Sequence, residues 1–421
     1  MRVLWFSINA GCYNSKISTA HNGGGWVSSL EKILNKRDDI HLGIAFKYNS
    51  NKFKDTIDGV DYYPISVTCG KVYRFREIFS IAHEEKLIIP ECIKIIEDFK
   101  PDIIQCFGSE WCYGLITKYT EIPVVIHMQG SMPSYLNALY PPKYSKYSRI
   151  FFDLSHFKFK KVVSSLFNEK KNIQRTEREI RILKVNKYFL GRTDWDRSIT
   201  KLFSPMSKYY ICNEALRDSF IYSTKTWESP NNEIITLCTT SNGSLWKGLD
   251  VILKTAHILK KHTDFKFRWL LIGGINNKKY IEWMEKLSFE DNNVEFIGIL
   301  NEVELKSVLL SSDIYIHPAY IDNSPNALCE AMLLGLPCIA SYVGGVPSLI
   351  QNEISGVLVP VNEPYYLAEK IISLSKDKTK QKMLSESAIA NTRIRHSSKN
   401  IENELITAYK KIIQDTNENR F

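Results

Sequence analysis

Short apolar runs alternate with segments of helical periodicity over nearly the whole chain, and the alternation occurs in two successive series. One helix illustrates the periodicity, because apolar side chains recur along a single face from Leu249 to Leu259. Runs that are apolar throughout predict strands buried on both faces, and helices between such strands predict parallel sheets. We therefore expect an α/β fold with two doubly wound domains that face each other across a cleft.

The predicted strands and one polar stretch divide the chain. The first series of strands is predicted at 3–8, 41–46, 61–65, 102–107, 124–128 and 188–190, and the second at 234–239, 268–272, 294–297, 313–316, 338–340 and 357–359. We interpret the polar residues 222–233 as a linker between an N-terminal domain, 1–221, and a C-terminal domain, 234–395. Residues 396–421 are expected to form a helix that can pack back on the N-terminal domain.

The composition excludes several classes of protein. With 44% hydrophobic and 24% charged residues, the 421-residue chain is neither disordered nor collagen-like. Its nine cysteines show no C-x-x-C spacing, which favours reduced thiols in a cytosolic protein over disulfides or a zinc site. No window approaches about 18 consecutive apolar residues, so no membrane-spanning helix is predicted. The excess of 55 Lys+Arg over 46 Asp+Glu favours an anionic partner: nucleic acid, an anionic membrane or a phosphorylated small molecule.

The segment 317–337 contains the strongest motif. A strand is predicted to end at His317, Ser324 suits a helix N-cap, and Pro325 suits the first helical position. Gly335 is a natural stop for this helix. Unpaired N–H groups at the start of a helix form an anion site that suits a diphosphate. The candidate residues for this site are Asn323, Ser324, Asn326 and Ala327.

Two acids flank that helix start. Glu330, about one turn inside the helix, can accept hydrogen bonds from two ribose hydroxyls, and Asp322, just before it, can reach a second polyol such as a sugar ring. Taken singly, each acid fits a structural role better, Glu330 as an acid in a helical turn and Asp322 as a loop residue. Together, with the helix start between them, they indicate a nucleotide-sugar site.

The order acid, seven residues, Glu330, Ala-Met and Gly-x-Pro resembles the signature of glycosyltransferase family 4, the group 1 glycosyltransferases. Further matches to the family follow in order along the chain: 22–26, His127, 246–248, 293–298, 344–347 and 356–359. The chain departs from the family pattern twice. Asp322 stands where the family usually has glutamate, and no arginine precedes Lys247 within 241–246.

The resemblance implies a GT-B fold, built from two Rossmann-like domains, and a retaining transfer from a nucleotide-sugar donor with no metal ion or other cofactor. It implies that Asp322 contacts the donor sugar, that Gly298 lies beside the nucleotide base, and that Gly24 and Gly25 form a glycine-rich loop near the donor. Lys247 also has an argument of its own. It lies between a predicted strand and a predicted helix, where an ammonium can neutralise the charge of a departing diphosphate.

Two residues of the N-terminal half have competing interpretations. His127 ends an apolar run, where it can contact a sugar or transfer a proton, although a lone histidine at such a place is more often structural. Arg192 is a candidate for contact with the acceptor or a phosphate. Thr193, which follows it, is predicted to cap a helix, and that structural interpretation explains most of the surrounding motif.

The positive charge is concentrated between 143 and 187, where thirteen Lys+Arg and four Asp+Glu give 13 − 4 = +9, equal to the charge of the whole chain. Seven aromatic residues lie in the same segment. Basic and aromatic side chains together suit an anionic membrane surface, and they could also suit RNA. Because the family resemblance implies that the N-terminal domain binds the acceptor, Lys158, Lys160 and Lys161 are candidates for contact with the acceptor or the membrane. The structural alternative is a helical hairpin with an aromatic core and solvated lysines.

These observations predict a cytoplasmic enzyme, peripheral on the inner face of the plasma membrane. It would transfer a sugar from a nucleotide-diphosphate sugar to a hydroxyl of a glycan or lipid-linked glycan, as in surface polysaccharide synthesis. Nucleic acid is not expected as a partner. Two alternatives stay open: a sugar-nucleotide 2-epimerase of GT-B fold, and a catalytically degenerate subunit that binds nucleotide sugar.

Overall fold

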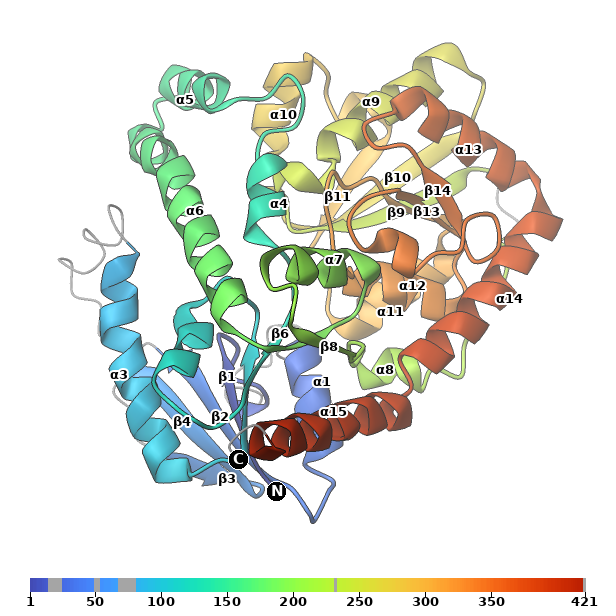
Figure 1. The fold of residues 1–421 in the computed structure, drawn as a ribbon. Coiled ribbons are helices and arrows are strands. Elements are labelled where there is room, and N and C mark those ends of the chain that lie inside the picture. Colours follow the sequence, from blue (N-terminus) through green and yellow to red (C-terminus); the bar gives the residue numbers. More distant parts are fainter. Residues whose placement is uncertain (14–24, 49–53, 67–80, 231–232, 419–421) are drawn as a thin grey trace. The chain divides into compact units, whose positions relative to one another are not determined.

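A computed structural model describes residues 1–13, 25–48, 54–66, 81–230 and 233–418 (Figure 1). The chain forms two compact units. Unit 1 comprises residues 1–136, 167–217 and 396–421, and unit 2 comprises residues 137–166 and 218–395.

Unit 1 is built on a sheet of eight strands in the order β3-β4-β2-β1-β5-β6-β7-β8. Only β3 and β4 pair antiparallel. The strands are β1 (Arg2–Ser7), β2 (His41–Tyr48), β3 (Asp55–Ile57), β4 (Val60–Ser66), β5 (Ile103–Phe107), β6 (Val124–His127), β7 (Tyr188–Gly191) and β8 (Lys208–Ile211). The helices are α1 (Gly25–Leu34), α3 (Ala82–Phe99), η2 (Cys112–Lys118), α4 (Met132–Asn137), the C-terminal part of α6 (Phe159–Val185), α7 (Asp194–Phe203) and α15 (Ser398–Glu418).

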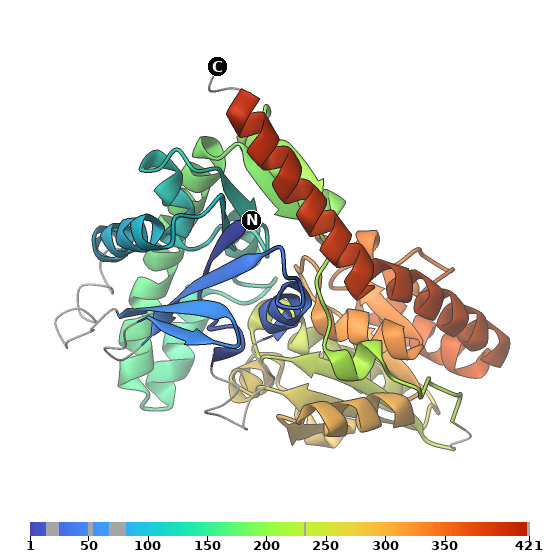
Figure 2. The same ribbon diagram turned by 90° about the horizontal axis from the view of Figure 1, so that it is seen from below.

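Helix α15 belongs to the core of unit 1, next to the N-terminal strand β1 (Figure 2). Apolar residues of α15, including Leu405 and Ile412, join the hydrophobic cluster of the unit. The Trp5 indole donates to the Tyr409 hydroxyl at 3.0 Å, and that hydroxyl donates to Gln105. Buried polar groups are costly unless they are paired, so this chain of hydrogen bonds fixes α15 on the sheet.

Unit 2 contains six parallel strands in the order β11-β10-β9-β12-β13-β14. The strands are β9 (Ile235–Ser241), β10 (Phe267–Gly273), β11 (Val294–Gly298), β12 (Ile314–His317), β13 (Cys338–Ser341) and β14 (Val357–Val359). The helices are α5 (Lys146–Ser155), the first turns of α6, α8 (Asp218–Ile221), η3 (Leu245–Lys247), α9 (Leu249–His262), α10 (Lys278–Glu285), η4 (Glu290–Asn292), α11 (Glu302–Ser311), α12 (Asn326–Leu334), η5 (Val346–Ser348), α13 (Pro364–Lys376) and α14 (Lys378–Arg395).

The strand order of unit 2 reverses between β9 and β12. The chain proceeds outward from β9 to β10 and β11, and then continues with β12, β13 and β14 on the other side of β9. In open parallel sheets, ligands bind outside the carboxyl ends of the strands at such a switch point. The carboxyl ends of β9 and β12 are therefore the first place to look for a site.

The observed units differ from the predicted domains in two places. Residues 137–166 group with unit 2, although they lie within the predicted N-terminal domain. The reason is an anchor on α10, because Phe152 is buried against the Tyr280 ring at 5.2 Å and the Tyr144 hydroxyl donates to Glu285 at 2.8 Å. In the predicted linker, Trp227 is buried, and its main-chain N–H donates to the Leu334 carbonyl at 2.7 Å.

All twelve predicted strands are present, with ends that differ by at most two residues. The two further strands, β3 and β8, are short and partly exposed, so they lack the continuous apolar run on which the prediction relied. The eight described cysteines are free, while Cys69 lies outside the described residues. Among the helices described here, none is long and apolar enough to cross a membrane.

Candidate functional site

Three side chains from the carboxyl ends of β9 and β12 meet in unit 2. Lys247 ends η3, the short turn after β9, whereas His317 is the last residue of β12 and Asp322 lies in the loop that follows. The Asp322 carboxylate accepts from the Lys247 ammonium at 2.5 Å, and its same oxygen Oδ2 lies 3.1 Å from His317 Nε2. The switch point of the sheet thus carries a charged, largely buried cluster, Lys247–Asp322–His317.

Asp322 is ionised in this cluster. Burial by itself would raise the pKa of the carboxyl group, but the Lys247 ammonium and the adjacent His317 ring outweigh it and hold the pKa well below its usual value. The other oxygen, Oδ1, accepts from the Asn323 main-chain N–H at 3.1 Å. At neutral pH the site therefore presents a fixed carboxylate paired with a cation.

Two glycines allow the backbone to come close to this cluster. Gly248 has φ +75°, and a Cβ atom there would lie 2.0 Å from the Pro318 carbonyl oxygen. Gly344 has φ +50°, and its Cβ atom would lie 1.9 Å from the Asp322 carbonyl oxygen. That oxygen accepts from the Gly345 N–H at 2.9 Å. The loop that carries Asp322 is thus held from both sides by backbone that only glycine permits.

The predicted diphosphate site lies at the start of α12. The helix begins at Asn326, with Pro325 in extended conformation as its N-cap, so the prediction that Ser324 is the N-cap was wrong by one residue. The ψ angle of Pro325 is 111°, which is extended and not helical, so the first helical turn starts after this residue. Gly335 ends the helix at φ +84°, as predicted. Asn323 and Ser324 are buried, whereas Asn326 and Ala327 are partly exposed.

Other predicted donor residues occupy the same sheet or lie outside the described residues. Glu330 is in α12 and buried. Gly298 ends β11 at φ +79°, and no heavy atom lies within 4 Å of the place its Cβ atom would take, so open space adjoins this strand end. In unit 1, Gly25 begins α1 at φ +65°. Gly24 lies outside the described residues.

His127 is fully buried at the end of β6. Its Nε2 atom lies 3.2 Å from the Cys212 carbonyl oxygen, and its Nδ1 atom lies 3.1 Å from the Gln105 amide nitrogen. These partners fix a neutral ring that donates through Nε2 and accepts through Nδ1. Burial and the Arg192 guanidinium lower the pKa of His127 to about 3. The arrangement favours the structural interpretation of His127 over proton transfer.

Arg192 is also buried in unit 1. Its guanidinium lies 3.7 Å from the Glu214 carboxylate and 4.9 Å from the centre of the Trp26 ring, and it donates to the Met128 carbonyl at 3.3 Å. Thr193 caps α7, as predicted. Contact of Arg192 with an acceptor or phosphate stays a prediction.

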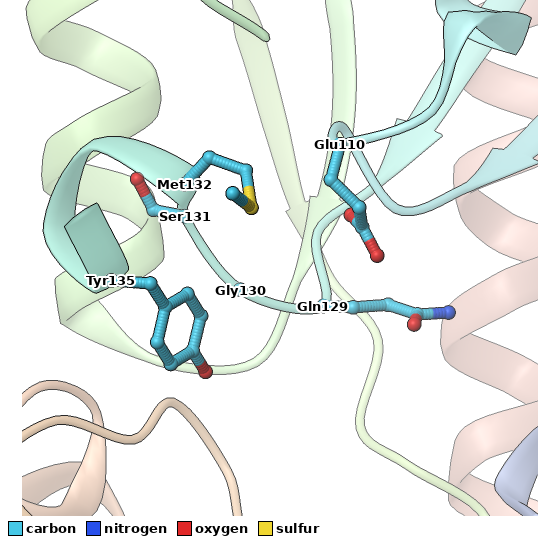
Figure 3. Close-up of a pocket in the computed structure, with 6 residues that line it drawn as sticks. All are labelled: Glu110, Gln129, Gly130, Ser131, Met132 and Tyr135. Carbon is cyan, nitrogen blue, oxygen red and sulfur yellow. The ribbon is translucent and has the colours of Figure 1, made fainter. Parts of the chain in front are cut away.

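A pocket of about 230 Å³ lies beyond the carboxyl ends of β5 and β6 in unit 1 (Figure 3). Figure 3 shows the Glu110 carboxylate and the Gln129 amide on one side and the Met132 and Tyr135 side chains on the other. Burial raises the pKa of Glu110. A carboxylate and an amide can bond to hydroxyl groups, and an aromatic ring can cover the apolar face of a small ring, so the pocket suits a polyol.

Glu179, in α6, holds the two loops of this pocket together. It accepts from the Ser109 hydroxyl at 3.0 Å and from the Met132 N–H at 2.7 Å. Burial and the nearby Glu110 carboxylate raise the pKa of Glu179 to about 8. The folded protein therefore holds this proton more tightly than the unfolded chain does.

This proton predicts a pH effect on stability. Between pH 4.5 and pH 8 the unfolded chain has released the Glu179 proton and the folded protein has not. The free energy of unfolding is therefore expected to fall by up to about 1.4 kcal/mol per pH unit as pH rises through this window. Urea unfolding of wild type and Glu179→Gln across the window measures the effect, and the substitution is expected to remove it. Equal pH slopes in the two proteins would contradict the assignment.

Lys158 lies in the turn between α5 and α6, and Lys160 and Lys161 lie in the first turn of α6. Lys160 and Lys161 are exposed, whereas Lys158 is half-buried with its ammonium 4.7 Å from the centre of the Phe152 ring. The three lysines lie within the part of the chain that groups with unit 2, as Asp322 and Lys247 do.

One family model matches the part of the chain that carries this site. Residues 225–391 match the model of the glycosyl transferases group 1. The matched stretch makes up less than half of the chain. The match includes the three residues of the cluster, Lys247, His317 and Asp322, and also Glu330 in α12.

Relatives with assigned names match this chain over part of their length. The chain is 31% identical over 140 residues to the amylovoran biosynthesis glycosyltransferase AmsK of Erwinia amylovora. The aligned stretch covers 31% of this chain and 33% of that protein. It spans less than half the length of the curated relatives that it matches first.

Solved structures match over nearly the whole chain. Sucrose-phosphate synthase from Thermosynechococcus elongatus superposes with a TM-score of 0.73 at 12% identity, covering 98% of this chain and 99% of that one. The Anabaena protein HepE, solved in complex with UDP, gives a TM-score of 0.63 at 14% identity, covering 98% and 100%. These likenesses show the fold, which is that of the GT-B glycosyltransferases, as the family resemblance implied.

Three residues of the two sites, His317, Glu110 and Glu179, were not predicted from the sequence. His317 was considered only as the end of a strand, although its position five residues before Asp322 is a usable signal. Glu110 lies three residues after the end of β5, and an acid so close to a strand end is also a usable signal. Glu179 gives no local signal, because it comes from a helix about 70 residues farther along the chain than Ser109.

Proposed function

We propose that this protein is a retaining glycosyltransferase that moves a hexosyl group from a nucleotide-diphosphate sugar to a hydroxyl of a glycan or lipid-linked glycan. The observation that carries the proposal is the Lys247–Asp322–His317 cluster at the switch point, within the stretch that matches the group 1 glycosyltransferase model. We further propose a role in the synthesis of a surface polysaccharide. The name of AmsK, which assigns that relative to amylovoran biosynthesis, supports this role.

The chemistry follows from the charges of the cluster. In the transfer, the bond between the sugar and the diphosphate breaks, a bond to the acceptor oxygen forms, and the acceptor proton leaves with the diphosphate. Lys247, together with the N–H groups at the start of α12, would stabilise the departing negative charge. Asp322 is held ionised, and its carboxylate already accepts from the Asn323 N–H. It would also accept hydrogen bonds from the sugar hydroxyls. Glu330 would bind the ribose.

The Lys247 ammonium and the N–H groups at the start of α12 can together hold a diphosphate. We therefore propose that transfer needs no metal ion or other cofactor. HepE was solved with UDP bound, which supports a uridine nucleotide as the first donor to try. We also propose that the protein works in the cytoplasm, peripheral on the inner face of the plasma membrane. The free cysteines and the basic segment around α5 and α6 support that location.

One assay tests the function. The full chain is incubated with labelled UDP-, GDP- or ADP-sugars and a membrane lipid extract, with and without EDTA. We expect label to enter the lipid fraction with the anomeric configuration retained, and at the same rate when EDTA is present. A donor that raises the melting temperature identifies the nucleotide beforehand.

The same assay distinguishes the alternatives. An epimer of the donor that appears without an acceptor would instead support a sugar-nucleotide 2-epimerase. Thermal stabilisation by a donor without turnover would support a nucleotide-sugar-binding subunit. An inverted product would overturn the retaining mechanism, and loss of transfer in EDTA would overturn the metal-independent one.

A further inference from the structure

Helix α5, the first turns of α6 and the turn between them expose an unusual set of large apolar side chains. Tyr147 and Phe157 are each 81% exposed, Phe151 is 62% exposed and Phe159 is 61% exposed. Leu154, Val163 and Leu166 of the same two helices are also exposed. Single exposed apolar residues are ordinary, but seven of them on two consecutive helices and the turn between are typical of an interaction site. We call these seven residues, with Lys158, Lys160 and Lys161, the α5–α6 surface.

This surface is presented by a well-anchored helix. On its opposite side, α5 buries Phe152, and Ser148 lies within hydrogen-bond distance of the Tyr280 hydroxyl at 2.7 Å. Arg149 donates to the Asn277 side chain at 2.6 Å. The aromatic residues of the sequence segment therefore divide into two groups: Tyr144 and Phe152 form the anchor, and the exposed ones are left for another partner.

The charge around the exposed group is positive. Residues 137–166 hold six Lys+Arg and one acid, Asp153, so their net charge is 6 − 1 = +5. Asp153 is buried and paired with Arg149 at 2.9 Å. Lys160 and Lys161 form no ion pair with any residue that the structure describes. Burial and the Lys161 ammonium lower the pKa of Lys158, which reflects how closely the cations are gathered.

Phe157 occupies a position that favours glycine. It has φ +56° and ends α5 in a turn closed by a hydrogen bond from the Lys158 N–H to the Asp153 carbonyl at 2.8 Å. Helices commonly end in this way with glycine, because a side chain is strained in the left-handed region. A phenylalanine that is both strained and exposed contributes little to folding, which suggests that it serves binding.

We propose that the α5–α6 surface docks on an anionic lipid bilayer, with the aromatic side chains in the headgroup region and the lysines against the lipid phosphates. The proposal deepens the membrane association included in the proposed function, by naming the surface responsible. Basic and aromatic residues together are the composition of interfacial membrane-binding segments. An RNA partner would require the aromatic rings to stack on bases, and it is kept as an outcome of the test.

The test measures binding of the full chain to vesicles, without any sugar donor, so it does not depend on transferase activity. Wild type is expected to float with vesicles that contain phosphatidylglycerol and not with vesicles of phosphatidylcholine alone. The triple substitution Lys158→Gln, Lys160→Gln, Lys161→Gln is expected to weaken binding about 10–100-fold. As the control, Lys376→Gln, Lys378→Gln, Lys382→Gln removes the same charge from exposed positions in α13 and α14 and is expected to bind as wild type does.

Phe157→Gly separates binding from folding. The glycine fits φ +56°, so the melting temperature is not expected to fall, whereas vesicle binding is expected to weaken about tenfold because an apolar anchor is lost. Tyr365→Ser removes an aromatic ring that is 68% exposed in α13, and this control is expected to leave binding unchanged.

Three outcomes would overturn the proposal. The first is wild type that does not discriminate between the two kinds of vesicle. The second is equal binding by the two triple variants. The third is tighter binding of a labelled single-stranded RNA than of anionic vesicles, lost in the Lys158, Lys160 and Lys161 variant, which would assign the surface to nucleic acid. If transfer fails in the donor assay while vesicle binding behaves as described, the surface assignment stands and the proposed enzyme activity does not.

Discussion

Lys247→Met is expected to lower the rate of sugar transfer by about 10²–10³-fold. Removing one preorganised positive group from a developing negative charge typically has an effect of this size. In this protein the ammonium also balances Asp322, because the two groups lie 2.5 Å apart and are largely buried. The substitution should therefore reduce transfer and also raise the pKa of Asp322 toward its usual value. Initial rates at saturating donor measure the first effect.

A matched variant shows whether the loss belongs to the site. Lys254 in α9 pairs with the buried Asp250 at 2.8 Å, and its side chain is 23% exposed compared with 21% for Lys247. Lys254→Met removes a similar ion pair away from the cluster, and transfer is expected to persist near the wild-type rate. Melting temperatures of both variants separate unfolding from chemistry. A loss of transfer that is equal in both variants, or absent in Lys247→Met, would contradict the role of Lys247.

Gly344→Ala is expected to lower the free energy of unfolding by about 2–5 kcal/mol. The φ of +50° costs a side chain about 1–2 kcal/mol, and relieving a contact of 1.9 Å with the Asp322 carbonyl oxygen adds about 1–3 kcal/mol. Because that oxygen also accepts the Gly345 N–H, relief of the contact must displace the loop that holds Asp322. We therefore expect transfer to fall as well in whatever fraction folds. Urea unfolding measures the stability.

Gly298→Ala is the control for backbone strain. Gly298 has φ +79° and no heavy atom within 4 Å of the added carbon, so its substitution is expected to cost only about 1–2 kcal/mol of stability. The difference between the two alanine variants then isolates the contact at Asp322. Similar losses in both would mean that the Asp322 loop accommodates the methyl group without rearranging.

Several elements could be predicted from local sequence alone. The strands that pack into the centres of the two sheets are apolar at nearly every position, and all of them were found. Thr193 and Gly335 were correctly assigned to helix ends, because capping depends on residues within one turn. Ser324 was placed one position too early, since Pro325 has an extended ψ of 111° and is itself the N-cap.

The aromatic segment shows where local pattern stops being informative. For the aromatic residues between 143 and 187, the sequence alone left two interpretations: a buried core or an exposed surface. Some of these residues are buried and others are exposed. Phe152 is buried because Tyr280 lies against it, whereas the adjacent Phe151 is 62% exposed. The deciding contact comes from a helix more than 100 residues farther along the chain, and no spacing within the segment encodes it.

By itself, the sequence determined the fold class, the two series of strands, and the identities of Lys247 and Asp322 as candidates for one site. These inferences depend on periodicity and on residues that precede or follow a strand end. Only the tertiary structure decided that Lys247, Asp322 and His317 share one ion-paired cluster, and that His127 has both ring nitrogens occupied. The reason is physical: burial and pairing are set by which strands lie side by side, and β9 and β12, which are adjacent in the sheet, are about 70 residues apart in the chain.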